Sequence, residues 1–143
     1  MLSLLKIQDY LNKANRGDVT ISPSLLEEFA RDCRDSANKQ LSGREKTGWR
    51  IRMSGLGRPL CQQMLERDGK VQDMEYNALF RFLFGDITEA IVMMVLKGAG
   101  IKIVDAQKSV ELKIDNNVIK GTLDVILEDE LGQQKVWDIK SAS

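Results

Sequence analysis

Apolar residues recur at helical spacing through the first half of the chain. One such face runs through residues 1–15. Ser22-Pro23 is a start signal for a second helix, because serine caps a helix N-terminus and proline fits the first helical turn. A short helix is predicted over 59–67, where Gly69 follows as a stop signal. The first half of the chain is therefore predicted to be helical.

The second half begins with one more helix and then changes to a two-residue repeat. A helix is predicted over 77–98, and its second half is apolar on all sides, which is typical of a buried helix. Strands are predicted over 108–115, where apolar residues alternate with polar ones, and over the two apolar segments 121–127 and 136–141. Polar residues at 128–133 predict a turn, so the last two strands should form an antiparallel hairpin.

Each of the last two strands carries an aspartate inside an apolar run, which is costly unless something compensates the charge. Successive strand residues point to opposite faces, so Asp138 and Lys140 share one face, and Asp124 can meet Asp138 across the hairpin. Two carboxylates supply the hard oxygen ligands that Mg²⁺ prefers. A lysine beside them can orient water or offset charge on a phosphate. The pattern indicates a divalent-metal site for phosphodiester hydrolysis.

A third acidic residue, Glu89, falls within the helix predicted over 77–98. At helical spacing it lines up with Phe82, Met93 and Leu96, which places it on an interior stripe.

The strand aspartates and Glu89 both have a plainer interpretation. The strand aspartates can belong to a solvated face with an ion pair, since such short spacings arise often by chance. Glu89 can simply mark the solvent edge of the helix.

This order of elements and acidic residues resembles the PD-(D/E)XK nuclease superfamily, and most closely its RecB-type and lambda-exonuclease-like branch. The resemblance covers residues 84–143. It implies an α/β fold with a restriction-endonuclease-like core, in which a helix precedes a three-stranded meander and the N-terminal region is helical. The residues that match the family's catalytic pattern are Glu89, Asp124, Asp138 and Lys140. The implied metal ligands are Asp124, Asp138, the backbone carbonyl of Ile139 and Glu89, the last directly or through water.

The function implied by the resemblance is Mg²⁺- or Mn²⁺-dependent hydrolysis of DNA, by an exonuclease in recombination, repair or phage DNA processing. Two alternatives remain open. One is a structure-specific or restriction-type endonuclease, and the other is a catalytically inactive nucleic-acid-binding or assembly module with the same fold. All four motif residues are present, which favours an enzyme.

The family core continues beyond the lysine strand with a final helix and strand, which are absent from the given sequence. We therefore expect a fragment, or a homo-oligomer that associates through residues 135–141, because Trp137 and Ile139 would otherwise lack cover. An iron–sulfur cluster is not expected. Cys33 and Cys61 are the only cysteines, whereas the cluster-bearing members use one upstream and three downstream cysteines.

Charge is unevenly distributed along the chain, although the formal net charge is zero. Residues 31–58 carry eight basic and three acidic residues, and residues 103–143 carry eight acidic residues and five lysines. A basic segment beside an acidic pocket suits a protein that holds both phosphate and cations, but a solvated connector has the same appearance. Part of the basic segment is similar to an Arg/Ser element that contacts the DNA backbone in RecB-type nucleases. Its candidate DNA-binding residues are Arg50, Arg52, Ser54 and Arg58.

The chain contains no histidine, which excludes histidine general-base catalysis and histidine-ligated zinc. The length predicts one compact domain, with a helical region at 1–70 that includes a basic loop at 42–58, and a nuclease core at 71–143. We find no signal peptide and no apolar run long enough to span a membrane. Two cysteines fit a reducing compartment, so we expect a cytoplasmic location, in the host cytoplasm if the chain is viral.

Overall fold

Helices and strands follow the order predicted from the sequence. The computed structural model describes residues 2–42, 49–70 and 75–140. Their bounds are α1 (Leu2–Asn15), α2 (Pro23–Leu41), the 3-10 turn η1 (Met53–Gly55), α3 (Leu60–Arg67), α4 (Tyr76–Gly98), β1 (Lys102–Ile114), β2 (Asn117–Glu128) and β3 (Gln134–Trp137). The described chain is thus a mixed α/β fold with an open, three-stranded antiparallel sheet. None of the helices in these ranges is long and apolar enough to cross a membrane.

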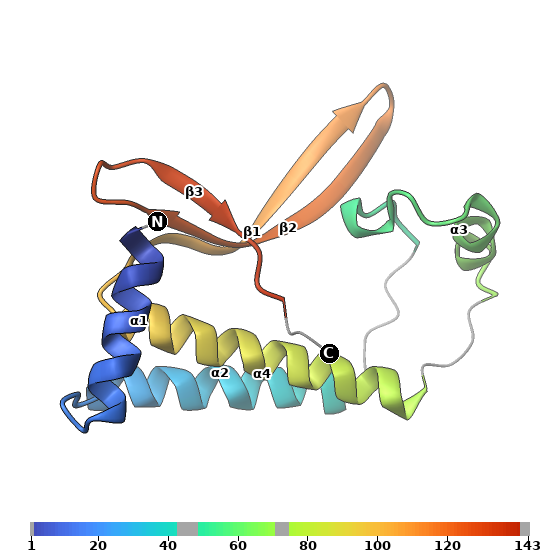
Figure 1. Ribbon diagram of the computed structural model, residues 1–143. Coiled ribbons are helices and arrows are strands. Elements are labelled where there is room, and N and C mark those ends of the chain that lie inside the picture. The colour runs from blue at the N-terminus through green and yellow to red at the C-terminus, as the bar shows by residue number, and fades with distance from the viewer. Residues whose placement is uncertain (1, 43–48, 71–74, 141–143) are drawn as a thin grey trace.

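The helices α2 and α4 lie side by side in one layer, and the sheet lies over them in a second layer (Figure 1). α2 begins where predicted, because the Ser22 hydroxyl accepts a hydrogen bond from the Leu25 backbone N–H at 3.3 Å and Pro23 starts the helix. At the end of α4, the Ile101 N–H returns to the Leu96 carbonyl at 3.0 Å. The chain therefore turns directly from α4 into β1.

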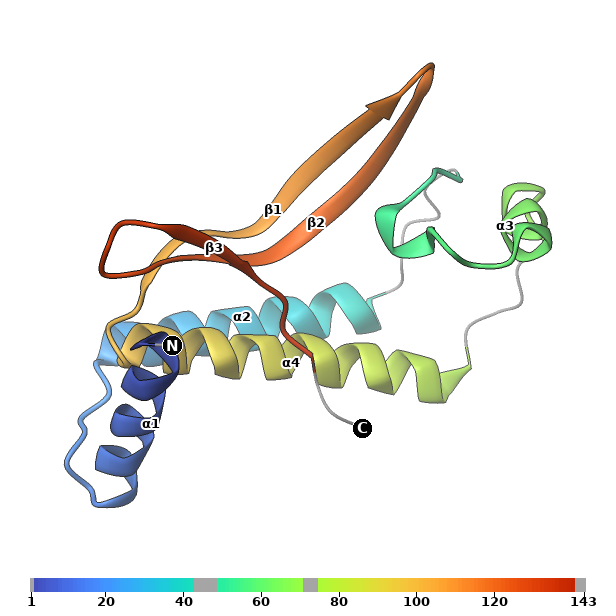
Figure 2. The same ribbon diagram turned by 45° about the horizontal axis from the view of Figure 1, so that its top comes forward.

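The hairpin of β1 and β2 is longer than the sequence pattern predicts. β1 begins at Lys102 instead of near Lys108, because its first residues pair with the end of β2, for example Ile103 with Leu127. The pairing register shifts by one residue after Ile103, which marks a β-bulge. Beyond it the hairpin bends away from the helices (Figure 2).

The predicted hairpin of the last two strands is confirmed. β3 pairs with the end of β2, so that Val125 lies opposite Trp137. The turn between them is closed by Asp129, whose carboxylate accepts the N–H groups of Leu131 and Gln133 at 3.0 and 2.9 Å. β3 ends at Trp137, so Asp138 and Lys140 follow the strand instead of lying within it as predicted. Ser141, the end of the predicted strand, lies outside the described residues.

The core lies between α4 and the part of the sheet nearest to it. Its buried residues are Leu96, Ile101, Val125 and Leu127. Trp137 and Ile139 pack against this cluster, as does Ile7 of α1. The expectation that Trp137 and Ile139 would lack cover is therefore wrong, because α4 and α1 occupy that face of the sheet.

The far half of the β1–β2 hairpin, which we call the arm (residues 108–123), meets the loop at 49–58 instead of a helix (Figure 1). Arg52 forms an isolated bridge with Lys120, whose N–H donates to the Ile51 carbonyl at 3.3 Å. The loop therefore adds backbone contacts to the edge of the arm. The rest of the predicted basic loop, residues 43–48, lies outside the described residues.

A glycine in β2 allows the loop to approach this closely. A Cβ atom at Gly121 would lie 2.5 Å from the Met53 sulfur, which is well inside normal contact distance. Near this contact, Ile119 is buried on the arm, at 7% exposure. The loop thus supplies the cover that the helices give to the other half of the sheet.

Candidate functional site

The two strand aspartates predicted to hold a metal lie next to each other. Asp124 is in β2, and continuing the β2–β3 register by one pair places Asp138 opposite it. Their carboxyl groups lie close enough for Asp124 to shift the pKa of Asp138. Asp124 is half-buried and Asp138 is exposed. The pair therefore sits at the point where the hairpin emerges from the core.

Ile139 and Lys140 make the remaining contacts of the pair. The Ile139 N–H donates to Asp124 Oδ2 at 2.8 Å, so the backbone after β3 is held against Asp124. Lys140 Nζ lies 2.9 Å from Asp138 Oδ2, as expected for residues on one face. The hydrogen bond from Lys140, and the interaction with the neighbouring Asp124, lower the pKa of Asp138, and Asp138 in turn raises the pKa of Lys140. Asp138 is therefore a carboxylate and Lys140 an ammonium group at neutral pH.

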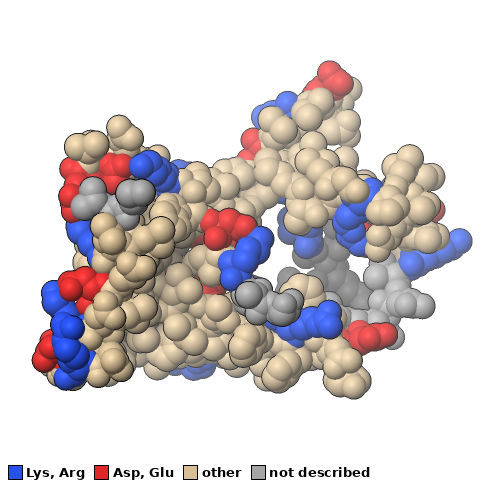
Figure 3. All heavy atoms as spheres, viewed as in Figure 1, with Lys and Arg blue, Asp and Glu red and all other residues tan. Residues whose placement is uncertain are grey.

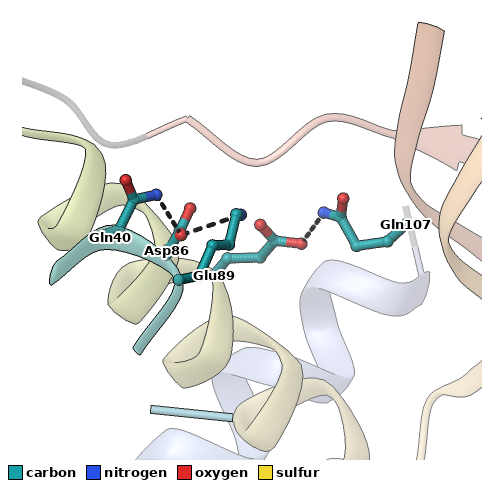
Figure 4. Close-up of polar contacts among 5 residues, drawn as sticks. Gln40, Asp86, Glu89 and Gln107 are labelled. Carbon is teal, nitrogen blue, oxygen red and sulfur yellow. Dashed lines mark hydrogen bonds and ion pairs between the residues drawn. The ribbon is translucent and has the colours of Figure 1, made fainter. Parts of the chain in front are cut away.

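Glu89 approaches the pair from the helix layer. It is half-buried on α4, and its carboxylate accepts a hydrogen bond from the side-chain amide of Gln107 in β1 (Figure 4). Burial raises the pKa of Glu89, while the bond from Gln107 acts against this rise and the negative charge of Asp124 adds to it. The helix glutamate is thus close enough to Asp124 for their charges to interact.

A pocket of about 450 Å³ opens beside Glu89, between α2, α4 and β1. Asp86 lies one helical turn before Glu89 and accepts hydrogen bonds from Gln40 at 2.8 Å and Lys39 at 3.2 Å (Figure 4). Gln40 is buried. The charged residues that line the pocket are Glu28, Asp32, Asp35, Lys39, Asp86, Glu89 and Lys97. Of the two neighbouring acidic residues on α4, Asp86 is thus held by α2 and Glu89 by β1.

The donor atoms around the aspartate pair fit a hard divalent cation. Mg²⁺ is often held by one or two carboxylates, with water and substrate phosphate completing its shell. Asp124 and Asp138 supply two carboxylates, and the peptide of Ile139 lies beside them. Over the described ranges, no three Asp, Glu or Cys side chains converge closely enough to bind a metal ion together. Within the described ranges, Glu89 does not form a three-carboxylate cluster with the two aspartates.

A second groove, of about 380 Å³, lies between the loop and the arm. Arg50, Arg52 and Ser54, three of the four predicted DNA-binding residues, line it from the loop. The polar residues that line it from the arm are Ser109, Lys120 and Thr122. On the face drawn in Figure 3, Lys and Arg side chains border the hollow between the arm, the loop and the helices. Cations and hydroxyl groups are the side chains that bind nucleic-acid phosphates.

Arg58, the fourth predicted DNA contact, is placed differently. Its guanidinium forms two hydrogen bonds with the Glu66 carboxylate of α3, at 2.6 and 3.3 Å. It does not line the groove that contains Arg50 and Arg52. The structure therefore brings three of these residues together and uses Arg58 to hold α3 against the loop.

Two contacts near the site were not predicted from the sequence. Asp86 had a signal, since it is an acidic residue one turn before Glu89 in a largely apolar helix. Gln107 had none, because its role depends on a left-handed backbone with φ of 53° inside a strand. The contact of Gln40 with Asp86 depends on how α2 packs against α4, which no local pattern encodes.

Comparisons with known proteins do not assign the chain to a family. A scan against known protein families, a search of curated proteins and a search of solved structures each found no match. The chemistry of the site is therefore judged from its own residues.

Proposed function

We propose that this chain is a divalent-metal-dependent deoxyribonuclease of the PD-(D/E)XK type, acting as an exonuclease in recombination, repair or phage DNA processing. The observation that carries the proposal is the contact between Asp124 and Asp138, with the Ile139 N–H on one carboxylate and Lys140 on the other. A solvated strand face needs no such convergence. The contacts favour a built site over an incidental surface ion pair.

Mg²⁺ or Mn²⁺ would be held by Asp124, Asp138 and the backbone carbonyl of Ile139, with Glu89 assisting through water. In sites of this class, a bound ion lowers the pKa of its water and offsets the charge that develops on phosphate. Asp138 is ionised at neutral pH, and Lys140 lowers its pKa further below the ordinary value. Two neighbouring carboxylates repel each other without a cation, so the pair favours cation binding.

Lys140 is the group best placed to assist hydrolysis. Its side chain is 79% exposed, and its ammonium group already reaches Asp138. The raised pKa keeps it protonated, so it acts as a hydrogen-bond donor and a positive charge, not as a general base. It would orient the attacking water and stabilise charge on the phosphate oxygens.

The groove between the loop and the arm would hold the DNA backbone. Neither Arg50 nor Arg52 forms an ion pair in the described part of the chain, so both guanidinium groups remain available to phosphate. Thr122 lines this groove and lies two residues before Asp124 in β2, so the two side chains share one face of the sheet. A strand bound in the groove would therefore be led towards the aspartate pair.

The proposal is tested by hydrolysis of end-labelled duplex DNA with the full chain in Mg²⁺ and in EDTA. The wild type should release nucleotides from DNA ends in Mg²⁺ only. Asp124→Asn and Asp138→Asn should each lower the rate by about 100-fold or more, because each removes a charged ligand. Asp115→Asn is the matched control, since it neutralises an aspartate at the hairpin tip, where asparagine tolerates the left-handed backbone.

Wild-type rates in both site variants, or hydrolysis that persists in EDTA, would contradict the proposal. Covalently closed circular DNA separates the two kinds of nuclease, because it offers no end to an exonuclease. Cleavage of the circle would support the endonuclease alternative. Binding of DNA without cleavage in either metal would support the inactive binding module.

A further inference from the structure

Two non-glycine residues in the described ranges have a left-handed backbone, Asp115 with φ of 51° and Gln107 with φ of 53°. This region is unfavourable for residues with a Cβ atom, although aspartate tolerates it better than most. Asp115 has an evident reason, because it lies in the two-residue turn between β1 and β2. Gln107 lies within β1, where an extended backbone is the norm. Such outliers often mark functional sites.

The strand pairing passes over Gln107 at the point where it faces the candidate site. Ala106 pairs with Val125 and Lys108 pairs with Leu123, so Gln107 lies opposite Asp124 without forming a ladder pair of its own. In a regular strand the two side chains would share one face of the sheet. Instead, the Gln107 amide reaches α4 and donates to the Glu89 carboxylate (Figure 4).

We propose that Gln107 is a positioning residue, which holds the Glu89 carboxylate beside the Asp124–Asp138 pair. This inference rests on the proposed function, because it presumes that Glu89 assists at the metal site. The bond holds Glu89 Oε1, one of the two oxygens of the carboxylate. The neighbouring carboxylate on α4, Asp86, is bound instead by Lys39 and Gln40 of α2.

Two substitutions separate the hydrogen bond from the backbone effect. Gln107→Met keeps the length of the side chain and the left-handed residue, but removes the amide donor. Gln107→Gly removes the side chain and also relieves the backbone strain, since glycine adopts this conformation freely. Asp115→Gly is the matched control, because it relieves the same strain at the hairpin tip, away from the site.

Both Gln107 variants should lower kcat for Mg²⁺-dependent DNA hydrolysis by roughly 10- to 100-fold, the range found for residues that orient metal-site groups. KM for DNA should stay close to the wild-type value, because Gln107 does not line the basic groove. Gln107→Gly should melt at or above the wild-type temperature, as should Asp115→Gly, which keeps full activity. A merely structural role for Gln107 predicts instead that activity and melting temperature fall together.

Coupling provides a second readout, in which Glu89→Gln serves as the background. If Gln107 acts through Glu89, adding Gln107→Met to Glu89→Gln should lower kcat little further. A third readout needs no catalysis: titration calorimetry should show Mn²⁺ affinity weakened about tenfold in both Gln107 variants and unchanged in Asp115→Gly. An inactive wild type would overturn the proposed function. An active wild type whose Gln107 variants retain kcat and Mn²⁺ affinity would overturn only the role of Gln107.

Discussion

The two halves of the β1–β2 hairpin are stabilised by different means. Near α4, Val125 and Leu127 are 1% and 2% exposed and belong to the hydrophobic core. On the arm, Leu112 and Ile114 are 47% and 49% exposed, and the loop at 49–58 replaces the helices as the neighbour. Burial therefore anchors one half of the sheet, whereas a few loop contacts hold the other.

The candidate site lies where these two halves meet. Asp124 directly precedes the core residue Val125, and it directly follows Leu123, which lines the basic groove. Gln107, opposite Asp124, is the residue at which the ladder is interrupted. The proposed metal ligands thus rest on the rigid half, and the proposed DNA groove lies on the exposed half.

The largest difference between the halves should appear in core truncations. Leu127→Ala should lower the free energy of unfolding by about 2–4 kcal/mol, because it removes a fully buried side chain. Leu112→Ala is the matched truncation on the arm and should cost less than about 1 kcal/mol, since half of that side chain is already in water. Urea unfolding measures both values. Equal losses would mean that the arm is as well packed as the core.

A glycine pair on α4 tests how α1 covers the helix layer. A Cβ atom at Gly98 would overlap the Tyr10 ring of α1, whereas a Cβ atom at Gly85 meets nothing within 4 Å. Gly98→Ala should therefore destabilise the protein by about 1–3 kcal/mol, and Gly85→Ala should stabilise it by up to about 1 kcal/mol through helix propensity. If thermal unfolding shows the same shift for both, α1 is not docked on Gly98.

The turn between β2 and β3, in the core half of the sheet, contains a carboxylate whose contribution to stability should depend on pH. Hydrogen bonds from Lys135 and from the Gln133 and Leu131 N–H groups hold the pKa of Asp129 below its ordinary value. The contribution of a carboxylate with a lowered pKa is fully present above the ordinary value and is lost as pH falls through the folded-state pKa.

Asp129→Asn should therefore lower stability at neutral pH, and its unfolding free energy should fall less steeply than that of the wild type below about pH 4. The measurement is urea unfolding at a series of pH values. Parallel curves for the two proteins would show that the Asp129 contacts do not contribute to stability.

The smallest effects are expected in DNA binding, from the arginines of the loop that meets the arm. Arg52→Ala should reduce the slope of log affinity against log salt by about 1, because one phosphate contact is lost. Arg58→Ala should leave that slope almost unchanged, since its guanidinium is bound to Glu66 outside the groove. Fluorescence anisotropy with duplex DNA at several salt concentrations measures both. A larger slope change for Arg58 than for Arg52 would reverse this assignment.

The sequence predicted the features that depend on local signals, and it did not predict those that depend on contacts between distant residues. The helices and the β2–β3 hairpin follow from local signals, such as the Ser22 cap and the polar turn between two apolar segments. The early start of β1 comes from pairing with distant residues, which local alternation does not reveal. The ion pair of Arg58 with Glu66 likewise depends on how α3 folds back on the loop. Local patterns therefore predicted the aspartate pair, but not the residues that orient its neighbours.

The most direct test of the account is Mn²⁺ binding by the aspartate pair, followed by electron paramagnetic resonance of the free ion. The account predicts that the wild-type chain takes up Mn²⁺, that Asp124→Asn and Asp138→Asn each weaken this uptake strongly, and that Asp115→Asn binds as the wild type does. Undiminished uptake in both Asp124→Asn and Asp138→Asn, or no uptake by the wild type, would contradict the assignment of this pair as the metal site.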